Sequence, residues 1–142
     1  MENELYLHTS DGLTYGRGYV YSLQYHLVWC TKYRKSVFQG EIAEEVKTNL
    51  KTIAGDIGFT IDAMEVMPDH IHLLINAKPQ LRISDAMKII KGNLARWLFI
   101  SHPEIRKQLW GGHLWNPSYC AITVSDRSRD QIHRYIESQK KK

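Results

Sequence analysis

The stretch that decides the fold runs Phe59-Thr-Ile-Asp-Ala-Met-Glu-Val-Met-Pro-Asp-His-Ile-His-Leu-Leu-Ile-Asn76. Residues 59–66 and 70–76 are short runs rich in apolar and β-branched side chains, which is typical of strands. Met67-Pro68-Asp69, between the two runs, has the composition of a tight turn. The stretch therefore predicts an antiparallel β-hairpin.

The second run of this hairpin places two histidines on one face. Side chains at i and i+2 point to the same side of a strand, so His70 and His72 share a face, with Cα atoms about 6–7 Å apart. Ile71, Leu73 and Ile75 point the other way, toward the expected core. Two neighbouring imidazoles on the free face suit a metal site, although a pair of exposed surface histidines has the same spacing.

The flanking sequence predicts further strands and helices. Residues 19–31 are dense in aromatic and β-branched side chains, and apolar residues recur at helical spacing between Glu41 and Ile57. Ser84 is expected to cap a second helix that ends before Pro103, and Ser125 or Asp126 to cap a last one. The expected order is strand 19–31, helix 41–57, hairpin 59–76, helix 84–102, a short helix to residue 109, strand 118–124 and helix 126–139.

This order predicts a single α+β domain over residues 1–142. A βαββαβ sequence is that of a ferredoxin-like (RRM-like) sandwich, an antiparallel sheet with helices on one face. Residues 1–18 contain several glycines and are expected to be irregular. The C-terminal segment, 126–142, is an additional helix with a basic tail and must pack elsewhere.

The last helix carries the second half of a candidate site. Tyr135 and Gln139 are four residues apart and therefore neighbours on one helical face, although Tyr135 could equally be a half-buried structural residue. Two imidazoles, an amide oxygen and a phenol together suit phosphodiester transfer with Mg²⁺ or Mn²⁺, because the ligands leave the ion's charge uncancelled. A phenol with a pKa near 10 needs such help to attack at neutral pH.

Charge and composition indicate which partners to expect. The chain has 19 Lys and Arg against 15 Asp and Glu, a net charge of +4, which is weak evidence for nucleic acid on its own. No apolar run is long enough to span a membrane, no Gly-rich nucleotide-binding loop is present, and two isolated cysteines fit a cytoplasmic protein. Glu65 is a candidate to lie near the metal, or is a solvated strand residue, and Asp69 is a candidate to orient a histidine, or is simply the turn residue that its position favours. The candidate DNA contacts are His26, Lys32, Tyr33, Arg34, Lys91 and Arg96.

Five ordered segments resemble a known family. They are Tyr25–Arg34, Met67–Ile75, Lys91-Gly92, Leu109–Tyr119 and Tyr135–Gln139. Together they are similar to the single-tyrosine HUH (His-hydrophobic-His) transposases of the smallest prokaryotic insertion sequences. The match covers nearly the whole chain.

The resemblance implies a specific activity. Such proteins are homodimers that bind hairpins at transposon ends and excise the element as single-stranded DNA. Tyr135 would be the nucleophile that forms a 5′-phosphotyrosine, and His70, His72 and Gln139 would be the metal ligands. In this family the tyrosine helix often completes the partner's site.

Two other functions remain open on sequence grounds. One is a different HUH nickase, a replication initiator or relaxase, although those enzymes are usually larger. The other is a non-catalytic RNA-binding sheet of the same fold, which would stack bases on sheet aromatics, where this sequence places histidines.

Overall fold

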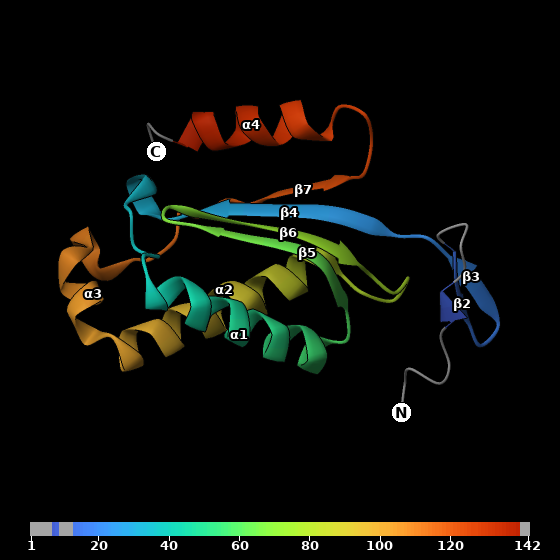
Figure 1. Ribbon diagram of the computed structural model, residues 1–142, viewed down its shortest axis with the longest axis horizontal. Coiled ribbons are helices and arrows are strands. Elements are labelled where there is room, and N and C mark those ends of the chain that lie inside the picture. Colours follow the sequence, from blue (N-terminus) through green and yellow to red (C-terminus); the bar gives the residue numbers. More distant parts are fainter. Residues whose placement is uncertain (1–6, 9–12, 140–142) are drawn as a thin grey trace.

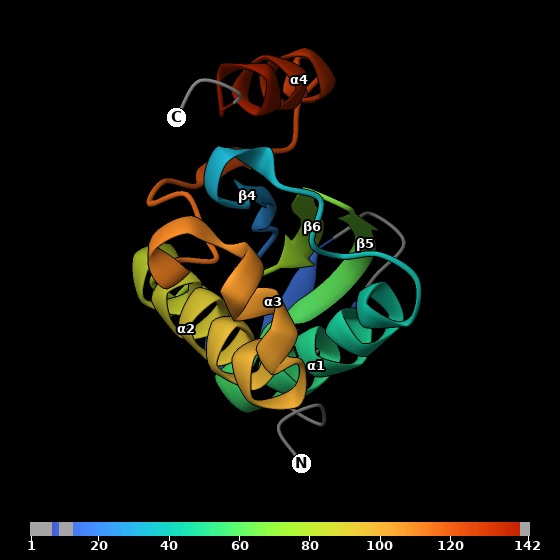
Figure 2. The same cartoon turned by 90° about the vertical axis from the view of Figure 1, so that its left-hand side faces the viewer.

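The computed structural model describes residues 7–8 and 13–139, and its centre is a four-stranded antiparallel sheet. The strands are β4 (Gln24–Cys30), β5 (Thr60–Met67), β6 (His70–Asn76) and β7 (Cys120–Thr123), in the order β5-β6-β4-β7. Helices α1 (Glu41–Ile57) and α2 (Ile83–Ser101) cover one face, and α4 (Ser128–Ser138) lies across the other (Figures 1 and 2). The expected α+β architecture, with its antiparallel sheet and an additional C-terminal helix, is confirmed.

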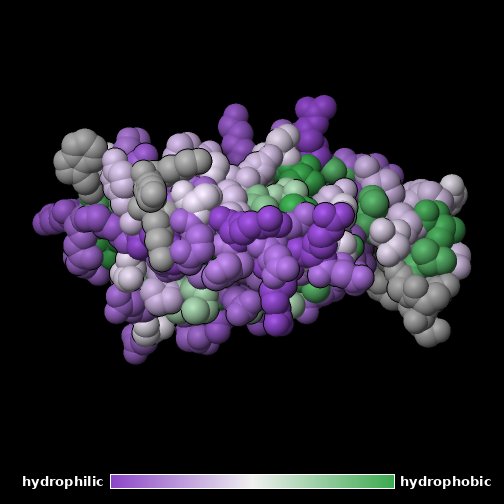
Figure 3. Space-filling model, turned by 90° about the horizontal axis from the view of Figure 1, so that it is seen from above, coloured by the Kyte–Doolittle hydropathy of each residue, from purple (hydrophilic) through white to green (hydrophobic). Residues whose placement is uncertain are grey.

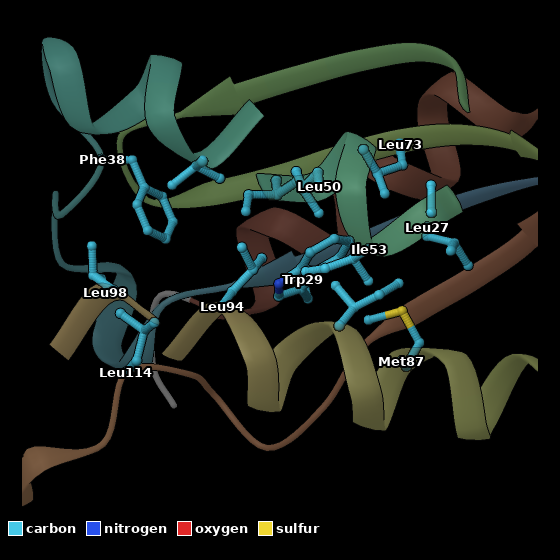
Figure 4. Packing of buried hydrophobic residues seen from close by; sticks show 14 of the residues in the cluster. Leu27, Trp29, Phe38, Leu50, Ile53, Leu73, Met87, Leu94, Leu98 and Leu114 are labelled. Atoms are coloured by element: carbon cyan, nitrogen blue, oxygen red, sulfur yellow. The ribbon is translucent and has the colours of Figure 1, made fainter. Parts of the chain in front are cut away.

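The core lies between the sheet and the α1–α2 layer (Figure 4). Burial along β6 alternates as predicted, with Ile71, Leu73 and Ile75 fully buried and the intervening side chains partly exposed on the α4 side. Leu50 of α1 and Met87 of α2 pack against this apolar face. Because burying each such side chain contributes about 1.5–3 kcal/mol, this face determines the orientation of β6.

The helix boundaries differ from expectation at two N-termini. Helix α2 begins at Ile83 after Arg82, so Ser84 lies within its first turn and is not the cap. Helix α4 begins at Ser128, two residues later than expected, and its N-cap position is Arg127, so neither Ser125 nor Asp126 is the cap. There the Ser128 hydroxyl accepts a hydrogen bond from the Ser125 backbone N–H (2.8 Å) and donates one to the Thr123 carbonyl (3.1 Å). Residues 125–128 therefore form the turn between β7 and α4.

The other connections follow the expected order. Helix α1 ends at Gly58, whose φ of 100° is readily available only to glycine. The short helix α3 (Pro103–Gln108) follows α2, and two 3₁₀ turns lie at Lys32–Arg34 and Trp110–Gly112. Within the described part of the chain, no helix combines the length and apolar character needed to cross a bilayer.

The N-terminal segment corrects two expectations. Where it is described it is not irregular: β1 (Leu7–His8), β2 (Thr14–Gly16) and β3 (Tyr19–Tyr21) form a small antiparallel sheet at one end of the molecule (Figure 1). The strand expected at 19–31 is therefore two strands in two sheets. Gly18, with a φ of 83°, allows the tight turn that pairs β3 with β2.

Candidate active site

The two histidines of β6 face α4, and a carboxylate holds each ring. His70 Nδ1 lies 2.8 Å from Asp69 Oδ1, and His72 Nδ1 lies 3.3 Å from Glu65 Oε1. Glu65 is the register partner of His72 on β5, and Asp69 is the last turn residue before β6. Because a carboxylate only accepts hydrogen bonds, both Nδ1 atoms carry the proton and both Nε2 atoms keep their lone pairs. Metal-binding histidines are usually oriented in this way.

A third imidazole lies beside this pair. His26, on the neighbouring strand β4, has its Nδ1 2.9 Å from His72 Nε2, so it donates a hydrogen bond to that lone pair. Burial, and secondarily the neighbouring His72, lowers the pKa of His26. Burial also lowers the pKa of His72, against the opposing effect of Glu65. Both rings are therefore neutral at pH 7, and neutral imidazole is the form that binds metals.

These histidines line a groove of about 490 Å³ between the sheet and α4. The sheet contributes His26, Glu65, His70 and His72. Helix α4 contributes five further residues, which are Ser128, Arg129, Ile132, His133 and Ile136. Arg129 and His133 were not among the predicted site residues, although their four-residue spacing places them on one helical face.

Tyr135 and Gln139 lie on a different side of α4. The Tyr135 hydroxyl is 2.6 Å from Ser118 Oγ, and Gln139 Oε1 accepts hydrogen bonds from Asn116 Nδ2 (2.5 Å) and Ser118 Oγ (3.3 Å). The Gln139 side chain is buried, and burial raises the pKa of Tyr135 to about 12, despite the opposing effect of its hydrogen bond with Ser118. The phenol and the amide oxygen are thus both occupied by the segment before β7.

One chain therefore holds the two halves of the predicted site apart. Neither Tyr135 nor Gln139 is among the described residues that line the histidine groove. Within the same described ranges, no group of three or more His, Cys, Asp and Glu side chains is arranged to hold a metal ion. The Nε2 lone pairs of His70 and His72 are of the kind that binds a divalent ion, but His26 must first release its hydrogen bond to His72, and a further ligand must come from elsewhere.

Asn116 and Ser118 were not selected from the sequence. They belong to the Trp-Asn-Pro-Ser-Tyr motif, which carried the family resemblance but gave no role to individual residues. Lys91 of α2 fixes this segment, since its ammonium donates to the carbonyls of Asn116 (2.9 Å) and Ser118 (3.2 Å). Burial lowers the pKa of Lys91. The Lys91 ammonium thus points into the protein, whereas the sequence predicted that it would contact DNA.

The other candidate DNA contacts are distributed over several surfaces. Lys32 and Tyr33 lie in the turn after β4, where the Lys32 ammonium is 5.1 Å from the Tyr33 ring centroid and Tyr33 is exposed. Arg34 turns inward and pairs with Asp69. Arg96 is exposed on α2, on the face of the sheet opposite the groove. Of the six candidates, only His26 lines the groove itself.

Comparison with known proteins identifies the family. A family model described as "Transposase IS200 like" matches residues 19–139. The chain belongs to this transposase family. Membership confirms the resemblance found in the sequence and decides against the RNA-binding alternative.

Individual relatives of the transposase support the same assignment. It is 55% identical over 124 residues to the ISDra2 transposase TnpA of Deinococcus radiodurans, which covers 87% of this chain and 89% of that protein. It is 27% identical over 119 residues to the transposase of insertion sequence IS200 from Salmonella typhimurium, covering 84% and 78% of the two chains.

Solved structures agree with the fold. The crystal structure of a putative transposase from Deinococcus radiodurans R1 superposes with a TM-score of 0.83 at 52% identity, covering 87% of this chain and 95% of that one. A REP-associated tyrosine transposase bound to a REP hairpin superposes with a TM-score of 0.56 at 17% identity, covering 84% and 66%. At that identity, the second comparison supports the fold alone.

Proposed function

We propose that this transposase cleaves and rejoins single-stranded DNA at insertion-sequence ends, with Tyr135 as nucleophile. In the proposed step the phenol oxygen bonds to phosphorus and the bond from phosphorus to the 3′ oxygen breaks. The phenol gives up its proton as the new bond forms, the departing 3′ oxygen takes one up, and the 5′ phosphate stays on the tyrosine. Because the ester bond is exchanged and not hydrolysed, the 3′-hydroxyl of another end can reverse the step without ATP.

The observation that carries this proposal is that the histidine pair and the helix of Tyr135 lie on the same side of the sheet. The sheet presents His70 and His72 with rings oriented by carboxylates and with Nε2 atoms that act as acceptors, that of His72 taking the hydrogen bond from His26. Helix α4 carries the phenol, and the amide follows one turn later. Helix α4 lies on the side of the sheet opposite α1 and α2 (Figure 2), and the groove lined by His70 and His72 is on that side. A family of DNA transposases needs a nucleophile and a means of stabilising phosphate charge, and these two parts supply both.

His70, His72 and Gln139 would hold a divalent ion, Mg²⁺ or Mn²⁺. A bound ion would polarise the scissile phosphate and offset the charge that develops during transfer. Asp69 and Glu65 keep the two rings in the required tautomer, and burial keeps His72 neutral. Nitrogen ligands would also accept Zn²⁺, so the choice of ion depends on the open positions and on its availability.

A homodimer would join the two halves of the site. Within one chain, Ser118 and Asn116 occupy the Tyr135 hydroxyl and the Gln139 oxygen away from the groove. Helix α4 must therefore leave this position, or a second copy must supply its own α4, before reaction. Exchange of α4 between two copies satisfies this requirement without refolding the sheet.

The DNA would enter along the α4 side of the sheet. This side is largely hydrophilic (Figure 3), and its exposed basic side chains include Arg127, Arg129 and Arg134. In the turn after β4, Lys32 and Tyr33 provide a cation and an exposed ring suited to phosphate and base contacts. Hairpins at the transposon ends are the proposed ligands.

The test is capture of the covalent intermediate. The full chain is incubated with Mg²⁺ and single-stranded DNA carrying candidate element ends, and the products are separated on a denaturing gel. We expect a protein–DNA band that Tyr135→Phe abolishes, because phenylalanine has no oxygen to attack phosphorus. Tyr119→Phe, which alters a partly buried tyrosine packed against the core, is the matched control and should retain the band. A band that persists in Tyr135→Phe would refute the assignment.

A further inference from the structure

The turn after β4 contains an unusual backbone conformation. Tyr33 and Arg34 are consecutive non-glycine residues with positive φ, 55° and 53°. A residue with a side chain has a strained backbone at such a φ, and the conformation persists only where surrounding contacts hold it. In this chain they are the only non-glycine residues with positive φ among those described. Strain of this kind often lies at functional sites, so the contacts made by this turn are informative.

The strained turn directs its two side chains to different places. Tyr33 is 46% exposed, whereas the Arg34 side chain is only 16% exposed and reaches into the hairpin. Arg34 Nε donates to Asp69 Oδ2 at 3.0 Å, and the other oxygen of the same carboxylate accepts from His70 Nδ1 at 2.8 Å. One carboxylate thus connects Arg34 to a proposed metal ligand.

Two further contacts anchor this connection. The Thr31 backbone N–H donates to the Asp69 carbonyl at 3.0 Å, which joins the strained turn to the hairpin turn. An Arg34 guanidinium nitrogen also lies 3.5 Å from the Ile136 carbonyl on α4. Arg34 therefore contacts both the carboxylate that orients His70 and the helix that carries Tyr135.

We propose that Arg34 is a positioning residue for the metal site and not a DNA contact. By fixing Asp69 on its Oδ2 side, Arg34 turns Oδ1 toward His70 and keeps the proton of that ring on Nδ1. His70 Nε2 then faces the groove as a lone pair ready for a divalent ion. This inference rests on the proposed function, because it assumes that His70 is a ligand. Partners of this kind typically contribute 10–100-fold to metal affinity.

The alternative is that Arg34 binds a DNA phosphate, as its place in a basic turn suggested. A phosphate contact released by mutation weakens binding to all sequences and reduces the salt dependence of affinity by about one unit of slope. A positioning residue does neither. The two roles therefore differ in measurements that do not require catalysis.

The experiment measures metal affinity, histidine tautomer and DNA affinity in the full chain. Mn²⁺ affinity is measured by titration calorimetry, and the His70 tautomer by ¹⁵N NMR of the metal-free protein. We expect Arg34→Ala to weaken Mn²⁺ binding about 10-fold or more and to shift His70 toward the tautomer protonated on Nε2. Affinity for hairpin DNA, and its salt slope, should not change.

Lys35→Ala is the matched control. It removes the same charge from the adjacent position, but the Lys35 ammonium contacts the Gln108 carbonyl and not Asp69. We expect its Mn²⁺ affinity and His70 tautomer to equal those of the original protein. Arg34→Lys keeps the charge but not the guanidinium geometry, and should weaken Mn²⁺ binding by an intermediate amount. If Arg34→Ala does not fold, this variant still tests the proposal.

Two results would overturn the inference. One is an Arg34→Ala protein with unchanged His70 tautomer and Mn²⁺ affinity. The other is a loss of DNA affinity with a lower salt slope and no effect on the ion, which would make Arg34 a phosphate contact. Failure of the original protein to bind Mn²⁺ would instead refute the metal proposal, and the tautomer measurement would still decide whether Arg34 orients His70.

Discussion

At the scale of single residues, the burial of Tyr135 should make the stability of the protein depend on pH. Burial raises its pKa from 10.0 to about 12, so the folded protein retains a proton that the unfolded chain loses. The contribution of this phenol to the free energy of unfolding should therefore be fully present below about pH 10 and be lost between about pH 10 and 12. We expect a loss of about 1–2 kcal/mol after allowance for partial exposure, measured by urea unfolding at several pH values.

The comparison with Tyr135→Phe isolates the contribution of this phenol to the pH dependence. The variant lacks the titrating group and should show a smaller fall in unfolding free energy over the same pH interval. Equal falls in the two proteins would mean that the Tyr135 phenol is not buried against Ser118 in solution.

At the scale of secondary-structure elements, α4 is docked by fewer apolar contacts than the other long helices. Its buried side chains are Ser128 and Ile132, whereas α2 buries five, namely Ala86, Met87, Ile90, Leu94 and Leu98. Because apolar burial supplies most of the stabilisation, α4 should open at lower free energy. We expect its amides to exchange with deuterium faster than those of α1 and α2.

Hydrogen bonds that Asn116 and Ser118 make with Tyr135 and Gln139 also hold α4 in place. Asn116→Ala removes the hydrogen bond to the buried Gln139 oxygen and should accelerate exchange in α4 further, with α1 unchanged as an internal reference. Protection of α4 equal to that of α2 would contradict the idea that this helix is the mobile part of the site.

At the scale of the whole molecule, the separated halves of the site predict a dimer with exchanged helices. Light scattering should give twice the 16.6 kDa mass of one chain. The sharper measurement mixes Tyr135→Phe with His70→Ala and assays the covalent protein–DNA product. If α4 acts on the partner's sheet, mixed dimers contain one intact site and regain cleavage. If α4 acts on its own sheet, the mixture remains inactive.

The strands of the two sheets show which structural features the local sequence determines. Alternation along residues 70–76 identified the buried and histidine-bearing faces of β6, because a period of two depends only on adjacent backbone geometry. The continuous run 19–31 was misleading, since strand propensity does not say which strand a segment pairs with. Residues 19–21 pair with β2, and 24–30 pair with β6 and β7.

By itself, the sequence determined the α+β architecture, the shared face of His70 and His72, and the shared helical face of Tyr135 and Gln139. Only the tertiary structure decided that Arg34 faces Asp69, that His26 donates to His72, and that residues 116–118 hold Tyr135 away from the groove. Each of these contacts joins residues from different elements of the chain. Local periodicity carries no information about such pairs, because packing of the whole chain selects them.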